Sequence, residues 1–377
     1  MRVNHYVMVS CLVFGILVNI YVIIRLNIGV NIFEYLQKIQ NLNLVPKCEI
    51  DMDNLLNFID NRHFLELEEK EMRKETAVHE KTIQTMLFAF PGAGLGNKLF
   101  EVISLLGIAE TLQRSPVINA TNPDYVSTLS KNIQPIFPKL VEQFQLKIIP
   151  FTAIAHEHTN WGACCKFDNP AKFINRSEQH IMLDGHYFQS YKYFHHMRPK
   201  IREWLAPSKL TAVRAEILLP AKHRDDLIIC THVRRGDFQY DGVHQPSDAT
   251  FTRAATDFLV EFYRTENYKF LQETNGTRYN YTLPTVSPLY TAVLTPTLTP
   301  EIDLGFSRLF CDVTLITAPS STFGWWLSYL SKRKSTTYYR DITESKDGVI
   351  GEMREEDFYP PEWVKLKTDQ FGRISSF

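Results

Sequence analysis

Hydrophobic residues along the chain form one long run near the start and several short runs farther on. The long run extends from Tyr6 to Ile24 and is broken only by Ser10, Gly15 and Asn19. As a helix it spans roughly 28 Å at 1.5 Å per residue, close to the ~30 Å hydrocarbon core of a bilayer. Cleaved signal peptides have a shorter apolar core and a small-residue cleavage site, whereas Arg25 follows this run directly. The pattern favours an uncleaved signal anchor.

Polar and charged residues dominate the segment after this run. Residues 27–84 are rich in asparagine and charge, with a dense mixed run over 66–81. Its apolar positions do not keep a heptad for three repeats, which favours an exposed helix or flexible spacer over a coiled coil. We expect a cytoplasmic tail over 1–5, a transmembrane anchor over 6–26 and a stalk over 27–84.

Short apolar runs after position 85 predict a first α/β unit. Met86–Phe90 is typical of a strand, Pro91–Gly96 of a glycine-rich turn, Asn97–Leu112 of a helix with one apolar side, and Pro116–Ile118 of a second strand. Strand, glycine turn, helix and strand in this order form a βαβ unit.

The glycine-rich turn is similar to a dinucleotide-binding fingerprint, which needs a third glycine and an acidic residue after the second strand. This chain has Asn97 and Asn119 at those places, so NAD binding is disfavoured. Gly94 and Asn97 remain candidates for contact with a sugar or phosphate at a helix N-terminus. The alternative is a tight turn that lets the helix pack on the sheet.

A second unit begins with the apolar, β-branched run Leu227–Thr231, which is followed by His232 and then by Arg234 and Arg235. In open α/β sheets ligands bind beyond the carboxyl ends of the strands. Arginine there offers a planar fork of donors for phosphate or carboxylate. The alternative is a surface arginine pair bridged to Asp237.

A third unit has the same order. Val313–Thr317 predicts a strand and Thr322–Leu330 a helix, with Ser320, Ser321 and Thr322 at the N-cap. Hydroxyls and free N–H groups at a helix N-terminus can bind an anion, although the serines can also serve only to cap the helix. We expect the tryptophans at 325 and 326 to pack into the core.

Composition limits the ligands. The net charge of −1 over 377 residues gives no indication of a nucleic-acid partner. The only D-x-D sequence, Asp51 to Asp53, lies in the stalk, so no metal is expected. Two arginines and a hydroxyl-rich helix start suit a nucleotide diphosphate held without a metal ion.

Sequons and cysteines indicate the compartment. Four N-x-[ST] sequons all follow the anchor, at Asn119, Asn175, Asn275 and Asn280. They predict N-glycosylation and a luminal folded part. Beyond the anchor there are five cysteines, an odd number, in which adjacent Cys164 and Cys165 hold two separate bridges or none. No C-x-x-C pair suggests a zinc site.

The sequence His156-Glu157-His158 raises the possibility of a metal site. Residues i and i+2 do not share a helix face, so we expect an exposed loop there.

Four blocks together resemble the alpha-1,2-fucosyltransferases, Golgi type II membrane enzymes that use GDP-fucose. They are Gly94–Phe100, Leu183–Ser190, His232–Asp237 in the form H-x-R-R-x-D, and Ser320–Trp326. They occur in the family's order between about 86 and 330, and the divergence resembles that of nematode members.

The resemblance implies an α/β fold of two facing Rossmann-like domains (GT-B type) behind the anchor and stalk. We expect an acceptor-side domain over 85–222, a GDP-fucose-binding domain over 223–345 and a C-terminal segment over 346–377. It also implies fucose transfer to a galactoside with inversion at C1.

The resemblance assigns roles as well. Arg234 would hold the β-phosphate of GDP with help from His232 and Arg235, and Ser320, Ser321 and Thr322 would contact the diphosphate. Asp237 and Asp241 are candidates for the catalytic base only because they are near in sequence.

One departure from the family pattern leaves a second hypothesis open. The family usually has another strand ending in acidic residues, but residues 258–302 contain no aspartate. A short donor domain would suit a catalytically inactive Golgi member that binds glycans or partner proteins.

Overall fold

The computed structural model describes residues 80–87, 89–159, 164–264, 270–275, 290–295 and 298–377. All of them belong to one unit, Val78–Phe377, which is distinct from Met1–Ala77. The expected tail, the anchor and nearly all of the stalk therefore lie outside the described residues. Within the described ranges, no helix is both long and apolar enough to cross a bilayer.

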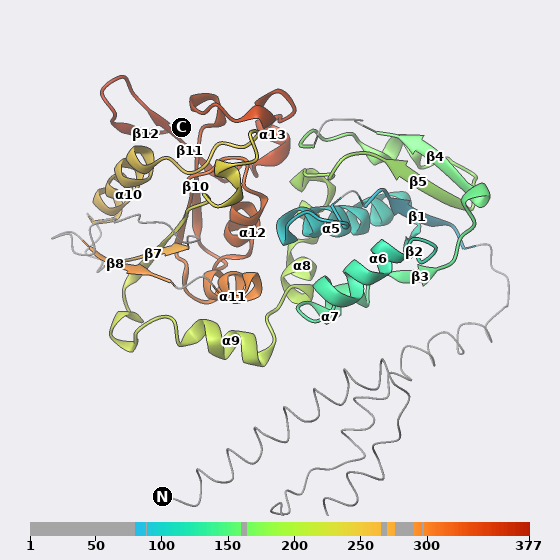
Figure 1. Ribbon diagram of the computed structural model, residues 1–377, viewed down its shortest axis with the longest axis horizontal. Helices are drawn as coiled ribbons and strands as arrows, with labels where there is room; N and C mark the ends of the chain where they lie inside the picture. The colour runs from blue at the N-terminus through green and yellow to red at the C-terminus, as the bar shows by residue number, and fades with distance from the viewer. Residues whose placement is uncertain (1–79, 88, 160–163, 265–269, 276–289, 296–297) are drawn as a thin grey trace, which may run out of the picture. The chain divides into compact units, whose positions relative to one another are not determined.

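The first half of this unit is a five-stranded sheet in the order β3-β2-β1-β5-β4 (Figure 1). All neighbouring strands are parallel. The strands are β1 Thr82–Thr85, β2 Ser115–Asn119, β3 Gln145–Lys147, β4 Ile154–His158 and β5 His180–Asp184. Helix α5, Leu95–Leu112, connects β1 to β2, and the short helices α6, Pro123–Thr128, and α7, Pro138–Val141, follow β2. The predicted βαβ unit is confirmed.

The position predicted for the first strand is wrong. The central strand β1 covers Thr82–Thr85, most of which was expected to end the stalk, whereas Met86 and Leu87 lie outside any strand and residues 89 and 90 form a turn. Leu87, Ala89 and Phe90 are nevertheless buried. The backbone N–H of Ala89 donates to the Glu101 carboxylate, at 2.9 and 3.0 Å from its two oxygens. This buried N–H group therefore has a hydrogen-bond partner without pairing to a strand. An apolar run thus marked burial and not a strand.

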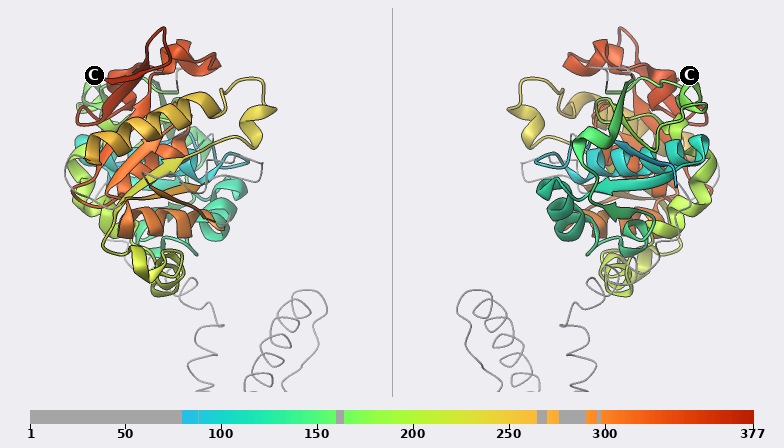
Figure 2. Two further views of the ribbon diagram at one scale, coloured as in Figure 1. Left: turned by 90° about the vertical axis from the view of Figure 1, so that its left-hand side faces the viewer. Right: turned by 90° about the vertical axis from the view of Figure 1, so that its right-hand side faces the viewer.

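The second half is a seven-stranded sheet in the order β12-β11-β10-β9-β6-β7-β8, parallel except for the β11–β12 pair. Its strands are β6 Leu227–His232, β7 Phe270–Asn275, β8 Thr291–Leu294, β9 Val313–Ile316, β10 Thr336–Arg340, β11 Val364–Thr368 and β12 Ile374–Ser376. Its helices are α10 Ala249–Arg264, α11 Pro300–Phe310, α12 Thr322–Leu330 and α13 Glu355–Phe358. Figure 2 shows α10 and α11 on opposite sides of the strands.

This sheet both confirms and corrects the expectations. Strand β6 and helix α12 form where the pattern predicted them. Residues 258–302, which contain no aspartate and suggested a short donor domain, include β7 and β8, both added in parallel beyond β6. Strands β11 and β12 join the same sheet, so it continues past position 345, where the donor domain was expected to end.

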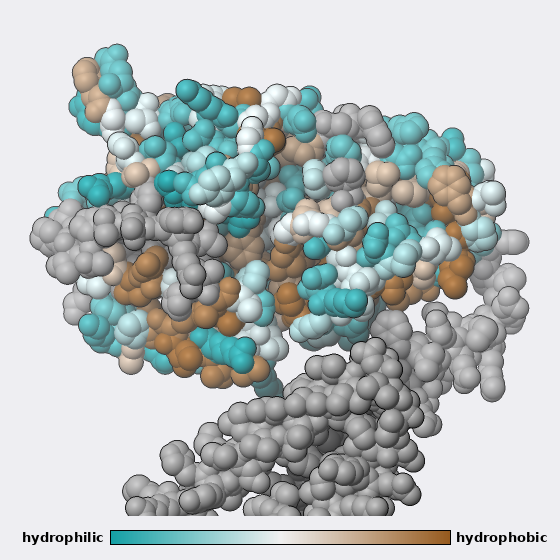
Figure 3. All heavy atoms as spheres, in the orientation of Figure 1, coloured by the Kyte–Doolittle hydropathy of each residue, from teal (hydrophilic) through white to brown (hydrophobic). Residues whose placement is uncertain are grey.

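Helices α8, Arg198–Trp204, and α9, Lys209–Glu216, connect the two halves along the chain. One side of α9 packs on α11, where Gly305 faces Ala215 and Thr211. The other side carries the exposed side chains of Leu210 and Val213. Figure 3 shows apolar surface in this region of the molecule.

One aromatic cluster joins the two halves. The Phe100 ring of α5 lies 4.7 Å from Trp325 and 5.2 Å from Trp326 of α12, measured between ring centroids. Both tryptophans are fully buried, as predicted, and the indole N–H of Trp326 donates to the carbonyl of Gly96 at 3.0 Å. The starts of α5 and α12 are therefore fixed against each other.

The cysteines differ from the expectation. Cys164 and Cys165 are bonded to each other, a pairing that the sequence argument did not consider. Cys230 of β6 is bonded to Cys311, which directly precedes the β9 region. The second bridge closes a separation of 81 residues and ties β6 to the end of α11, two residues before the neighbouring strand β9.

Candidate functional site

Strand β6 positions the double arginine. It lies between β9 and β7, and Ile228 to His232 are buried. The strand ends at His232, and Arg234 and Arg235 follow at its carboxyl end with partly exposed side chains. This is the edge at which open α/β sheets bind their ligands. The predicted location of the arginines is confirmed.

Arg234 is held from three directions. Its backbone N–H donates to Ser247 Oγ at 2.8 Å, and its guanidinium lies 5.3 Å from the centre of the Phe238 ring. Its Nη2 donates to Asp237 Oδ2 at 2.7 Å. The ion pair expected under the alternative interpretation therefore exists. Its side chains are 30% and 58% exposed, and such a pair contributes only about 0–1 kcal/mol, so an anionic ligand can compete for Arg234.

Ser247 fixes both arginines. It is buried, its backbone N–H donates to the carbonyl of Arg234 at 2.8 Å, and its own carbonyl accepts from Arg235 Nη1 at 3.2 Å. The Thr317 hydroxyl after β9 donates to Ser247 Oγ at 2.7 Å. The positive charges are thus oriented before any ligand arrives, which is the condition for strong electrostatic stabilisation.

The three hydroxyls at the start of α12 all have protein partners. Ser320 Oγ donates to the buried Asp347 carboxylate. Ser321 Oγ lies 3.0 Å from His232 Nε2 and caps the helix by accepting the N–H of Gly324 at 3.3 Å. Thr322 Oγ1 donates to Asn97 Oδ1 at 2.6 Å. Ser321 therefore caps α12, and contacts of the three hydroxyls with a diphosphate stay predictions.

His232 is buried at the end of β6 and packs against the start of α12. Burial, together with the neighbouring charge of Arg234, lowers its pKa to about 3, so the imidazole is neutral near pH 7. A Cβ on Gly324 would lie 2.4 Å from the imidazole ring, so only glycine allows α12 to pack this closely. His232 therefore adds no third positive charge near pH 7, and its assisting role stays a prediction.

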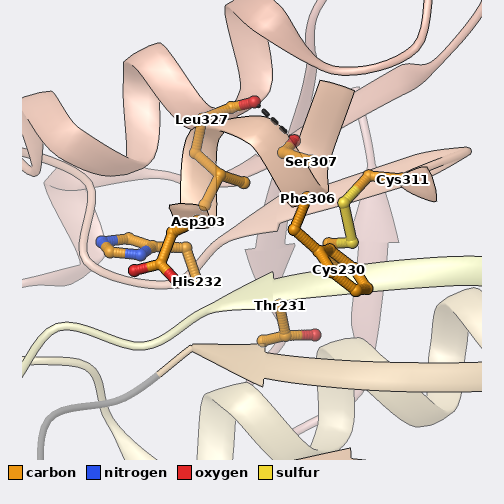
Figure 4. A pocket seen from close by; sticks show the side chains of 8 residues that line it. All are labelled: Cys230, Thr231, His232, Asp303, Phe306, Ser307, Cys311 and Leu327. Atoms are coloured by element: carbon orange, nitrogen blue, oxygen red, sulfur yellow. Dashed lines mark hydrogen bonds between the residues drawn. A yellow bond between two sulfur atoms is a disulfide. The ribbon is translucent and has the colours of Figure 1, made fainter. Parts of the chain in front are cut away.

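A small cavity of about 10 Å³ lies behind His232 (Figure 4). Side chains from β6, α11 and α12 line it, including Thr231, Asp303, Ser307 and the Cys230–Cys311 bridge. The Ser307 hydroxyl donates to the carbonyl of Leu327 at 2.7 Å. The cavity has room for about one water molecule and none for a sugar or a nucleotide.

The two candidate bases differ in their surroundings. Asp237 is more than half exposed and pairs with Arg234. Asp241 Oδ1 accepts the N–H groups of Val243 and His244 at 2.9 Å each, and its Oδ2 pairs with the His244 imidazole at 2.7 Å. Burial acts to raise the pKa of Asp241, but these hydrogen bonds together hold it below its usual value. Asp241 thus organises its loop, and a lowered pKa makes it a weaker base.

Asn97 connects the two halves of the unit. Its Oδ1 accepts from Thr322 and also from Gln189 Nε2 at 3.3 Å. A Cβ on the neighbouring Gly96 would lie 2.7–2.8 Å from Thr322 and Phe323, so this glycine allows a close approach. At Gly94, the N-cap of α5, a Cβ would meet nothing within 4 Å. The tight-packing alternative therefore applies to Gly96 and Asn97, while donor contacts of Gly94 and Asn97 stay predictions.

The loop after β5 contains a feature that the sequence argument missed. Tyr187 and Phe188 have φ values of 56° and 49°, a left-handed conformation that costs free energy for side chains of this size. Gln189 follows them and reaches both Asn97 and the carbonyl of Cys164. The loop lies in the Leu183–Ser190 block, and its Gly185 would place an added Cβ 2.5 Å from Thr159, but neither signal reported the strain. This strained turn belongs to the contact between the halves.

The histidine pair at 156 and 158 was expected in an exposed loop, which is wrong. Both residues lie on edge strand β4 and point to the same side, because strand residues i and i+2 share a face. His156 Nδ1 is 3.1 Å and His158 Nδ1 is 3.6 Å from the Asp184 carboxylate. Within the described ranges, no group of three or more His, Cys, Asp or Glu is arranged to hold a metal ion.

The sequons also separate by location. Asn119 is buried at the end of β2, where its Nδ2 donates to the carbonyl of Ile149 at 2.9 Å and its Oδ1 accepts from Thr121. Glycosylation at Asn119 is therefore contradicted, because this amide has no room for a sugar. Asn175 is exposed. The side chains at Asn275 and Asn280 lie outside the described residues.

Comparison with known proteins decides the family. No protein-family model matches the sequence. A Caenorhabditis elegans protein described as galactoside 2-alpha-L-fucosyltransferase is 64% identical over 404 residues, covering 100% of both chains. A second C. elegans protein of that description is 36% identical over 305 residues, covering 78% of this chain and 81% of the relative. The chain belongs to the galactoside 2-alpha-L-fucosyltransferase family. The resemblance carried by the four sequence blocks is confirmed.

Solved structures show a more distant similarity to this family member. A crystal structure of POFUT1 in complex with GDP aligns with a TM-score of 0.41 at 10% identity, covering 70% of this chain and 99% of that chain. Fucosyltransferase NodZ from Bradyrhizobium aligns with a TM-score of 0.40 at 12% identity, covering 79% and 98%. Family membership rests on the sequence relatives.

Proposed function

We propose that the chain is an inverting galactoside alpha-1,2-fucosyltransferase that moves L-fucose from GDP-fucose to a terminal galactoside of a glycan. The observation that carries the proposal is the double arginine, fixed by Ser247 at the carboxyl end of β6, in a chain 64% identical over its whole length to a protein described as such a transferase. A glycosyl nucleotide leaves as a diphosphate anion, and two oriented guanidinium groups are suited to it.

In the proposed reaction the acceptor hydroxyl attacks C1 of fucose from the side opposite GDP. A new C1–O bond forms, the bond from C1 to the phosphate oxygen breaks, and its electron pair leaves with GDP. Arg234, with Arg235 beside it, holds the growing charge on the β-phosphate. The N-terminal N–H groups of α12 and the positive end of its dipole add to this.

The acceptor proton needs a base, and Asp237 and Asp241 remain the proposed candidates. Asp237 is the more exposed of the two and already contacts Arg234. His232 is proposed to act through Ser321, because its Nε2 is occupied by the Ser321 hydroxyl and its pKa of about 3 keeps it uncharged.

The arrangement proposed is of the GT-B type, with the 85–222 half on the acceptor side and the second sheet on the donor side. The proposed location is the Golgi membrane, with the folded part in the lumen behind an anchor at 6–26. Exposed Asn175 is a suitable glycosylation site within this scheme.

A titration tests the donor assignment. Full-length chain, purified in detergent, is titrated calorimetrically with GDP and separately with GMP, which lacks the β-phosphate. We expect GDP to bind at least about tenfold more tightly, since each charge-assisted hydrogen bond is worth ~1.5–3 kcal/mol. Equal affinities would argue against a β-phosphate site at the arginines. No binding of either nucleotide would favour the inactive, glycan-binding alternative.

A further inference from the structure

The connection from β6 to α10 carries an exposed aromatic side chain. Its middle part, residues 237–247, projects from the body of the second half, as the yellow segment of Figure 2 shows. At its tip Tyr240 is 79% exposed and Val243 is 49% exposed. Exposed tyrosine is common in proteins, so its surroundings decide whether it has a role.

The projecting connection is fixed in its shape. Asp241 closes its tip through two backbone N–H groups and the His244 side chain. The His244 ring stacks on Phe238 with ring centroids 4.3 Å apart and planes 15° apart. From the C-terminal region the N–H of Gly348 donates to the carbonyl of Val243 at 2.7 Å. Tyr240 is therefore presented by a pre-formed loop, which lowers the entropic cost of binding to it.

The same connection is in contact with the proposed donor site. Phe238, which supports the stacked His244, also lies beneath the Arg234 guanidinium, and Asp237 pairs with Arg234. Tyr240 follows Asp237 by three positions. One end of the loop thus contacts Arg234 of the proposed diphosphate site, while its tip faces solvent.

We propose that Tyr240 is a stacking platform for the terminal galactose of the acceptor glycan, an inference that rests on the proposed function. Galactopyranose has one face of C–H groups, which packs against an aromatic ring, while the tyrosine hydroxyl remains available to the sugar's own hydroxyls. A neutral sugar needs no charged partner, and an exposed ring is accessible to the end of a long glycan. The donor also carries ring-shaped groups, guanine and fucose, and the test separates the acceptor from the donor.

The test compares the steady-state kinetics of the full-length wild type and its variants. Lactose is varied at saturating GDP-fucose, and GDP-fucose is then varied at saturating lactose. Tyr240→Ala is expected to raise KM for lactose about tenfold, the scale of one lost aromatic contact, and to leave KM for GDP-fucose within about twofold. Tyr240→Phe keeps the ring and should stay within about threefold for both substrates. Phe371→Ala, which removes an aromatic side chain that is 70% exposed on the β11–β12 turn, is the matched control and should change neither.

Two outcomes would overturn the platform. One is an unchanged KM for lactose in Tyr240→Ala, and the other is a rise in KM for GDP-fucose alone, which would place guanine on the ring. If the wild-type chain transfers no fucose, the proposed function fails but the platform is still tested. Saturation-transfer NMR with methyl β-galactoside then reports binding of the sugar directly. Equal signals from wild type and Tyr240→Ala would reject the stacking role of Tyr240.

Discussion

Arg234 combines a fixed orientation with partial exposure, and this combination distinguishes it from an ordinary surface arginine. Ser247 holds its backbone and Phe238 lies under its guanidinium, whereas its ionic partner Asp237 is more than half exposed. A ligand phosphate can take over from Asp237 at little cost because an exposed ion pair is weak.

Replacing this side chain should therefore remove transition-state stabilisation. Arg234→Ala is expected to lower kcat by about 10²–10³-fold, or ~3 kcal/mol, as for other fixed donors to a developing negative charge. Steady-state transfer assays measure this. The control is Arg224→Ala, which breaks an exposed pair with Glu216 away from the arginines and should keep wild-type activity. Wild-type kcat in Arg234→Ala would remove Arg234 from the mechanism.

The buried, neutral His232 predicts how the free energy of unfolding depends on pH. Its pKa is near 6.5 in an unfolded chain and about 3 in the folded protein, so between these values the unfolded state binds more protons. The contribution of neutral His232 is fully present above pH 6.5 and is lost as the pH falls toward 3. The free energy of unfolding should fall by up to ~1.4 kcal/mol per pH unit in this window from this residue alone.

Denaturant unfolding of the full-length chain at pH 7, 6 and 5 measures this slope. His232→Gln, which does not titrate, should show a flatter slope than wild type. His196→Gln changes an exposed histidine paired with Glu110 and serves as the control. A slope that is the same in wild type and His232→Gln would show that the imidazole is not buried in its neutral form.

At the scale of elements, the starts of α5 and α12 form the contact on which the site depends. The Thr322 hydroxyl, the Trp326 indole and the missing side chain of Gly96 all meet there. Because α12 also supplies the N–H groups proposed to hold the diphosphate, a shift of this helix would displace the site. The sequence placed both glycine and hydroxyls at helix starts and left packing and ligand contact open as alternatives, and the structure shows the packing contacts.

Gly96→Ala should reveal the packing role. The added methyl would overlap the Thr322 and Phe323 backbone, so we expect a loss of about 1–3 kcal/mol in the free energy of unfolding, with reduced activity. Gly92→Ala places the same methyl where nothing lies within 4 Å and should be nearly neutral. Denaturant unfolding measures the free energy of unfolding of both variants. Equal values for the two variants would contradict the close contact at Gly96.

Local patterns explain which elements could be predicted. β6 is a β-branched apolar run, and α12 begins with a serine cap, so local residues specify both. β1 could not be located because the apolar residues that follow it are buried in a loop. There the backbone N–H of Ala89 donates to the Glu101 carboxylate of α5 and needs no strand partner. The partners of Ser320, Ser321 and Thr322 lie far away in sequence, and no local pattern reports them.

At the scale of the whole molecule, the two sheets share one aromatic core, and the candidate site is assembled from both. The second sheet provides the arginines, and the first provides Asn97 and the strained Tyr187–Phe188 turn that reaches it through Gln189. Residues 258–302 include β7 and β8, which extend the second sheet beyond β6. A family member 64% identical along its full length supports an intact enzyme.

The most direct test of the account is the reaction itself. Full-length chain is incubated with GDP-fucose and a glycan ending in β-galactose, and the product is analysed by NMR for linkage and anomeric configuration. We expect fucose on O2 of galactose in the α configuration, with release of GDP, and a transfer rate about 10²–10³-fold lower in the Arg234→Ala control. Absence of product from a chain that is folded and binds GDP, or fucose at another position, would contradict the central claim.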